Sequence, residues 1–243
     1  MKRAERFYRD FTESSRWKSF RVRVETSDLY IRAGKDLSAP AEEIVRRLRK
    51  QIRAHIEKQI SFHTSLTPVE RLGGCPDIIT MMYNASEQAG VGPMAAVAGA
   101  VAEITGRELT EFSEEMIIEN GGDIWMKLSR PAVVTIYPGG YYFDGVALKI
   151  QSGQTPCGIC TSSARIGLSF SFGRADAATV IAPDAALADA IATEVCNRVK
   201  SEDDMEDAAS YGMDCGAGGV IILYRDQLVA RGDVELTDPD TED

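Results

Sequence analysis

The stretch that most constrains how this chain can fold is residues 115–123, Glu-Met-Ile-Ile-Glu-Asn-Gly-Gly-Asp, followed at once by a short apolar run at 124–126. Two runs of strand-forming residues joined by Asn120-Gly121 are typical of a tight β-hairpin, because a type I′ turn needs positive φ at both central positions. The simpler interpretation is a hairpin alone. The alternative is a ligand-binding turn, since the Asp123 carboxylate stands beside two glycines, where backbone can approach a ligand closely.

Other stretches predict the elements around this hairpin. Apolar and polar residues alternate over residues 19–33, which predicts a second hairpin with one solvent-exposed face. Apolar residues spaced four apart over 40–60 predict a long amphipathic helix with a basic outer side, and His55 lies at the boundary of its apolar stripe. Asp184 can cap a helix over 184–199. Further helices are expected at 76–89, 92–106 and, shorter and acidic, 201–212, and strands at 132–137, 146–150, 166–172, 179–182, 220–224 and 228–230.

These elements define the expected fold class as α+β, a single domain in which an antiparallel sheet packs against helices. A chain of 243 residues with 44% hydrophobic residues is large enough for one sizeable core. We place the domain at 1–231. Residues 232–243 contain six carboxylates and no basic residue, so this segment is expected to be a disordered, solvating tail.

Charge and composition exclude several function classes. Residues 1–60 carry 16 Lys and Arg against 9 Asp and Glu, whereas the rest carries 11 against 28. The net charge of −10 argues against nucleic-acid binding, and the basic part is expected to be a solvated helix face. The longest nearly apolar stretch, 93–102, is too short for a membrane span. We therefore expect a cytoplasmic protein with a small-molecule partner, and a homodimer is compatible with the sequence.

The helix after Gly92 is a candidate anion site. It follows a Gly-Pro pair, and its first backbone N–H groups lack partners within the helix, so they can hold an anion or phosphate. Packing alone also accounts for its many alanines. The common phosphate-loop and hydrolase motifs are absent from the chain.

Cys157 and Cys160 form the densest chemical motif, Cys-x-x-Cys. The pair can form a redox disulfide or supply half of a metal site, although a zinc site needs a second pair and none follows. A third interpretation is a reactive thiolate at Cys160, flanked by Thr161, Ser162 and Ser163, with Arg165 or Arg174 nearby. The remaining interpretation is that Cys160 is an inert, buried thiol on a strand. An odd number of cysteines, five, favours reduced thiols.

The order of five motifs resembles an uncharacterised bacterial and archaeal branch of the ApbE superfamily, whose best-known members transfer FMN from FAD to a protein threonine using magnesium. The resemblance covers nearly the whole chain except its acidic tail. The motifs occupy residues 92–100, 119–124, 160–163, 171–176 and 188–193.

The resemblance implies an ApbE-like T-fold and a flavin-type pocket. Its Gly-Gly-Asp turn, which approaches the flavin nucleotide in the transferases, matches Asn120, Gly121, Gly122 and Asp123. Its magnesium-binding helix residues match Asp189 and Thr193, and oxygen ligands one turn apart suit a hard cation. Magnesium and FAD are therefore the expected cofactors.

Two motifs of the transferases are absent here, a lysine in the Ala-rich helix and the His-Ile-x-Asp-Pro loop. The sequence therefore predicts a retained pocket for a nucleotide or similar anion and argues against flavin transfer itself. If the protein is an enzyme, a transferase is expected. The alternatives are a sulfur carrier acting through Cys160, since relatives have been linked with sulfur assimilation, and a non-catalytic assembly module.

One spatial prediction connects these residues. Residues 120–123, residues 160–163 and the helix start at Gly92 are expected to line one concave site, because each lies at the end of a strand or helix. Asp189 and Thr193 are expected to face the same site.

Overall fold

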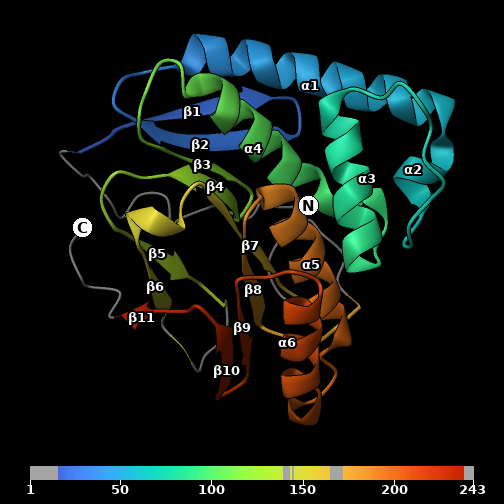
Figure 1. Ribbon diagram of the computed structural model, residues 1–243, viewed down its shortest axis with the longest axis vertical. Helices are drawn as coiled ribbons and strands as arrows, with labels where there is room; N and C mark the ends of the chain where they lie inside the picture. Colours follow the sequence, from blue (N-terminus) through green and yellow to red (C-terminus); the bar gives the residue numbers. More distant parts are fainter. Residues whose placement is uncertain (1–15, 139–142, 144, 165–171, 238–243) are drawn as a thin grey trace.

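The computed structural model describes residues 16–138, 143, 145–164 and 172–237, and its centre is an eight-stranded antiparallel sheet with the order β1-β2-β3-β4-β7-β8-β9-β10 (Figure 1). Its strands are β1 (Lys18–Val24), β2 (Ser27–Ala33), β3 (Met116–Asn120), β4 (Asp123–Lys127), β7 (Cys157–Ser162), β8 (Ala177–Ala182), β9 (Gly219–Tyr224) and β10 (Gln227–Gly232). A smaller sheet has the order β11-β6-β5, formed by β5 (Ala132–Ile136), β6 (Val146–Ile150) and β11 (Leu236–Thr237).

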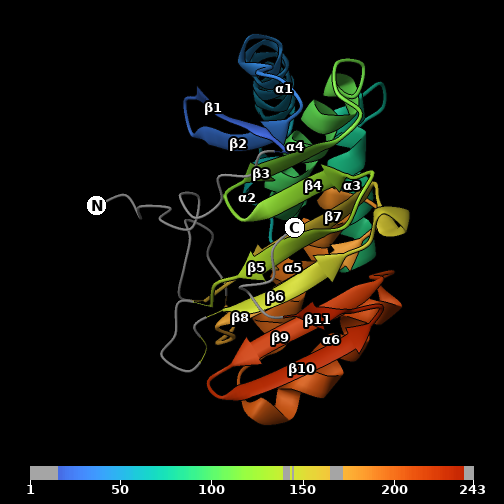
Figure 2. The same cartoon turned by 90° about the vertical axis from the view of Figure 1, so that its left-hand side faces the viewer.

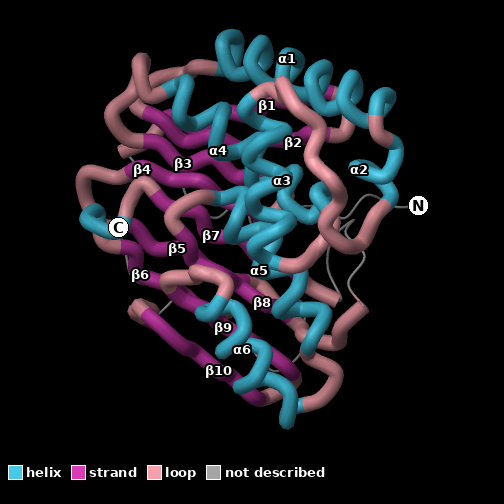
Figure 3. Tube along the Cα trace, turned by 45° about the vertical axis from the view of Figure 1, so that its right-hand side comes forward, coloured by secondary structure: helices cyan, strands magenta, loops and turns pink. Residues whose placement is uncertain are grey.

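The helices gather on one face of the large sheet (Figures 1 and 3). They are α1 (Ser38–Lys58), α2 (Ile60–Thr64), α3 (Asp77–Ala89), α4 (Val97–Leu109), α5 (Ala185–Arg198) and α6 (Met205–Asp214), with short 3₁₀ segments η2 (Pro93–Ala96), η3 (Ser152–Gln154) and η4 (Glu202–Asp204). α4 packs on β3 and β4, and α5 on β7 and β8. In Figure 2 the strands stand in front and the helices lie behind them.

The sheet separates two apolar cores, since successive strand residues point to opposite faces. The larger core joins the helices to one face and includes Trp125 and Cys160. The smaller core lies on the other face, where Met126 and Cys157 pack with residues of β5 and β6. β8 and β9, which contribute to both cores, are therefore buried at every residue.

Glycines let α5 approach its neighbours at backbone distance. A Cβ on Gly99 of α4 would lie 2.0 Å from the Ala185 carbonyl oxygen, and one on Gly158 of β7 would lie 2.3 Å from Ala185 Cα. The N-terminus of α5 is held between these two glycines. Asp184 caps the helix as expected, since its side chain accepts a hydrogen bond from Leu187 N at 2.8 Å.

The α+β class and the antiparallel sheet packed on helices are confirmed, and three details differ. The β3–β4 turn has Gly121 and Gly122 at its centre, with φ of 81° and 112°, while Asn120 is the last residue of β3. The first long helix breaks at Gln59, where the backbone is extended. Of the strand expected at 166–172, only Phe172 lies within the described residues, and it is not in a strand.

The acidic C-terminal segment is ordered in part. Leu236 and Thr237 pair with Leu148 and Ala147 of β6, which corrects the expectation of disorder from Gly232 onward. Residues 238–243 of that segment lie outside the described residues. Within the described part of the chain, no single helix is long and apolar enough to cross a membrane; α3 and the helix after it pass that test only together, with a bend of 109°.

Candidate functional site

The backbone N–H groups at the N-terminus of α4 are bonded to a side chain of the protein, the carboxyl group of Asp189. Asp189 of α5 accepts a hydrogen bond from Gly99 N at 2.9 Å, and Ala98 N also bonds to its carboxylate. Backbone N–H groups at a helix start favour negative charge, so this contact is stabilising. Asn120 lies at the same place, because its Nδ2 donates to Ala98 O at 3.1 Å.

Two further groups from the sheet meet Asp189 there. Asp123 at the start of β4 and Cys160 of β7 project to the helix-covered face, and each interacts electrostatically with Asp189. Thr161 N bonds to the Asp123 carboxyl. We call Asp123, Cys160 and Asp189, with the start of α4, the carboxylate site.

The carboxylate site lies in the interior and is acidic. Asp123 and Asp189 keep some exposed surface as residues, yet loss of water around their carboxyl groups raises the pKa of both. The pKa of Asp189 rises to about 7. Burial raises the pKa of Asp123 well above its usual range, and the charges of Asp189 and Glu119 add to that rise.

Cys160 is not the accessible thiolate that the sequence suggested. It is fully buried, and its thiol donates to Ala185 O at 3.3 Å. Burial, followed by the charges of Asp123 and Asp189, raises the pKa of this thiol well above its usual value. The structure therefore favours the inert-thiol interpretation of Cys160.

Cys157 and Cys160 also lie on opposite faces of β7, since they are three positions apart along an extended strand, where successive side chains alternate between faces. Cys157 packs in the smaller core and Cys160 in the larger one. All five cysteines are free thiols. The Cys-x-x-Cys spacing is thus a consequence of two core positions and not a redox pair.

The other predicted site residues divide between the carboxylate site and its surroundings. Thr161 Oγ1 bonds to Thr179 Oγ1 at 2.8 Å, and Ser162 and Ser163, at the end of β7, are half-buried. Thr193 is half-buried on α5, one turn after Asp189. Arg174 is exposed, and Arg165 lies outside the described residues.

Gly92 does not open onto the carboxylate site as expected. It is buried, and a Cβ there would lie 1.9 Å from the backbone oxygen of Ser65. Residues 93–96 form η2, and α4 begins only at Val97. The helix end that reaches the carboxylate site is therefore 97–99.

The carboxylate oxygens of Asp123 and Asp189 are the type of ligand that a hard cation such as Mg²⁺ prefers. Among the described residues, no group of three or more His, Cys, Asp and Glu is arranged to hold a metal ion. Two carboxylates are nevertheless enough for Mg²⁺, which keeps several waters and shares phosphate oxygens of its ligand. Asp123 and Asp189 are the residues that would hold it.

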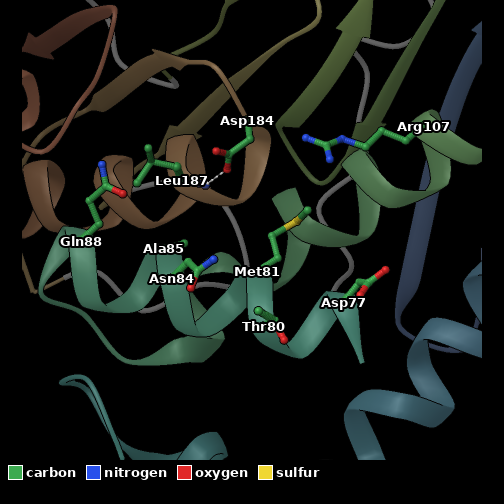
Figure 4. A pocket seen from close by; sticks show the side chains of 9 residues that line it. All are labelled: Asp77, Thr80, Met81, Asn84, Ala85, Gln88, Arg107, Asp184 and Leu187. Atoms are coloured by element: carbon green, nitrogen blue, oxygen red, sulfur yellow. Dashed lines mark hydrogen bonds between the residues drawn. The ribbon is translucent and has the colours of Figure 1, made fainter. Parts of the chain in front are cut away.

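A cavity of about 270 Å³ lies elsewhere, between α3 and the facing ends of α4 and α5 (Figure 4). Among the described residues, its lining includes none of the residues predicted for the site. Asp77, Thr80, Asn84 and Gln88 project from one side of α3, and Arg107 and Asp184 face them.

Beside this cavity lies Glu103, a buried acid that the sequence pattern did not indicate as a site residue. Its Oε2 accepts from Ala185 N at 2.6 Å, and its Oε1 pairs with the Arg107 guanidinium. Burial, reinforced by the charge of Asp184, raises the pKa of Glu103 to about 7. A single acidic residue within the apolar run 94–104 was the available signal.

The fold is that of the ApbE structures. A variant of the flavin transferase ApbE from Vibrio cholerae superimposes with a TM-score of 0.58 at 10% identity, covering 88% of this chain and 96% of that one. The ApbE protein from Thermotoga maritima gives a TM-score of 0.56 at 12% identity, covering 89% and 97%. At such identities the likeness establishes the fold alone.

The sequence itself defines the family. The chain belongs to the family described as "AbpE bacteria", whose model matches residues 9–218. It is 37% identical over 225 residues to the UPF0280 protein of Methanopyrus kandleri, covering 88% of each chain. It is 35% identical over 226 residues to the UPF0280 protein of Methanocaldococcus jannaschii, covering 90% of this chain and 92% of that one.

Proposed function

We propose that this protein binds magnesium together with a phosphate-bearing small molecule, in the first instance a flavin nucleotide, at the carboxylate site. The observation that carries the proposal is the convergence of Asp123 and Asp189 from two different elements. The charge of Asp189 raises the pKa of Asp123, so the two carboxylates repel one another when both are ionised, and a divalent cation would relieve that repulsion.

The site's charge determines how an anionic ligand would bind. The N–H groups at the start of α4 are already bonded to Asp189, so they are not available to a phosphate. An anion placed directly beside Asp123 would be repelled. A cation between carboxylates and phosphate removes both problems, which is why magnesium is part of the proposal.

The choice of a flavin nucleotide rests on the resemblance to the ApbE superfamily, because solved structures of this fold are named flavin transferases. When bound, magnesium would offset the phosphate charge. The chain lacks the transferases' lysine and His-Ile-x-Asp-Pro motifs. We therefore propose ligand binding without flavin transfer. Cys160 has no part in this function beyond packing, since its thiol is buried and protonated.

The test is the binding of FAD in the presence and absence of Mg²⁺, measured by isothermal titration calorimetry. We expect binding that is lost with a chelator. Asp123→Asn and Asp189→Asn should weaken it on the order of 100-fold, since each removes a charged ligand of the cation and even loss of an outer-shell partner costs up to about 100-fold. Asparagine is chosen because its side-chain oxygen can still accept the bond from Gly99 N.

Asp214→Asn is the matched control, since Asp214 is exposed at the end of α6 and should leave FAD binding unchanged. FAD bound equally well with chelator, or by both site variants, would refute the cation-bridged mode. No binding of FAD by the wild-type protein would refute the flavin assignment.

A further inference from the structure

Cys75 and His55 form a second chemical cluster, since His55 lies in the last turn of α1 and Cys75 lies two residues before α3. Cys75 Sγ lies 3.8 Å from His55 Nδ1 and 3.0 Å from Leu72 O. His55 is almost fully buried, so it is more than the boundary residue that the sequence suggested. The cluster shares no residue with the carboxylate site.

A hydrogen-bond chain behind His55 determines which of its nitrogens carries the proton. Gln59 Nε2 donates to Glu70 O at 2.8 Å, which turns Gln59 Oε1 toward Tyr83. The Tyr83 hydroxyl donates its one proton to that oxygen. His55 Nε2, 2.8 Å from the same hydroxyl, must therefore be the donor in their contact.

The consequence is that His55 Nδ1 carries a lone pair and faces the thiol of Cys75. Burial lowers the pKa of His55, so the ring stays neutral near pH 7. A hydrogen bond with Gln59 raises the pKa of His55 and partly opposes the effect of burial. Lys58 on α1 lowers the pKa further. Arg71, over the Tyr83 ring, is bonded to Glu87 of α3.

Cys75 is also the accessible cysteine of the protein. It is partly exposed, whereas the four others are buried. Two exposed glycines precede it, and an added Cβ at Gly73 or Gly74 would meet nothing within 4 Å. A thiol with a neutral base on one side and open space beside it is suited to nucleophilic chemistry.

We propose that Cys75 and His55 form a thiol-exchange site that accepts low-molecular-weight disulfides. The Cys75 proton turns from Leu72 O to His55 Nδ1, and the thiolate attacks one sulfur of the disulfide. A new S–S bond joins Cys75 to that half as the original S–S bond breaks. The departing thiolate takes the proton from Nδ1, so the products are a mixed disulfide and a free thiol.

The experiment measures the reaction of the intact protein with 5,5′-dithiobis(2-nitrobenzoic acid) by stopped flow, with mass spectrometry of the labelled site. We expect one thiol of the wild-type protein to react fast with the reagent, and we expect this fast reaction to be absent in Cys75→Ser. His55→Gln should slow it about tenfold at pH 7, because the attacking thiol then has no base to take its proton. A matched control is His63→Gln, since His63 is exposed on α2.

A measurement on the wild-type protein keeps the proposal testable if His55→Gln fails to fold. The chain has two histidines, so ¹⁵N-histidine labelling gives two resolvable rings. We expect an unprotonated Nδ1 for His55 at pH 7. An Nδ1–H tautomer, or a folded His55→Gln variant that reacts at the wild-type rate, would overturn the proposal.

Discussion

Replacing Gly158 with alanine is expected to destabilise the protein by about 3 kcal/mol or more, at or beyond the upper end for overpacking a core. The new Cβ would lie 2.3 Å from Ala185 Cα and 2.6 Å from Ala185 N. Both are backbone atoms, so no side-chain rotation relieves the clash. The first turn of α5 would have to leave β7, and the contacts of Glu103 and Asp189 would be disturbed with it.

Denaturant unfolding of Gly158→Ala beside the wild type measures this loss. Gly153→Ala is the matched control, because a Cβ at that exposed glycine meets nothing within 4 Å. It should change the free energy of unfolding by no more than about 0.5 kcal/mol. Equal stability of the two variants would mean that α5 does not pack at backbone distance on β7.

The hairpin at the centre of the sheet illustrates what local sequence can and cannot predict. Its strands follow from their apolar runs, but the Asn-Gly signal placed the turn one residue too early. Asn120 stays in β3, where it pairs with Leu29 and Asp123, and its side chain donates to Ala98 O of α4. That bond is a tertiary contact, and turn propensity alone contains no information about it.

The carboxylate site likewise has features that the sequence predicts and features that it does not. Asp123, Asp189, Asn120 and Cys160 were expected together, and the structure does bring them together. Their environments were not predictable, since the burial of Cys160 depends on how closely α5 packs. The opposite faces of Cys157 and Cys160, by contrast, follow directly from strand periodicity.

Buried polar residues inside apolar stripes were the hardest to interpret. Glu103 and His55 each lie in a helix whose periodicity predicts only a packed face. Their roles depend on partners far along the chain, Ala185 for Glu103 and Tyr83 for His55. Periodicity measures which side of a helix is buried, and it does not identify the partner of a polar group there.

Stability should depend on pH through Glu103, because its pKa rises from 4.5 to about 7 on folding. The folded protein favours the protonated acid, so this contribution is fully present below pH 4.5 and is lost as pH rises through 7. A shift of that size corresponds to about 3 kcal/mol. Asp189, with its pKa also raised to about 7, acts in the same direction.

Glu103→Gln separates the contribution of Glu103 to the pH dependence of stability from that of Asp189. Glutamine cannot ionise, and its side-chain oxygen can still accept the hydrogen bond from Ala185 N. We expect the variant to gain about 3 kcal/mol relative to the wild type between pH 5 and pH 8.5, with the slope from Asp189 unchanged. Unfolding is measured with chelator present, so that no cation neutralises Asp189. Glu108→Gln, an exposed position on the same helix, should follow the wild-type profile. Parallel profiles for Glu103→Gln and the wild type would mean that Glu103 is ionised in the folded protein, held by Arg107 against its burial.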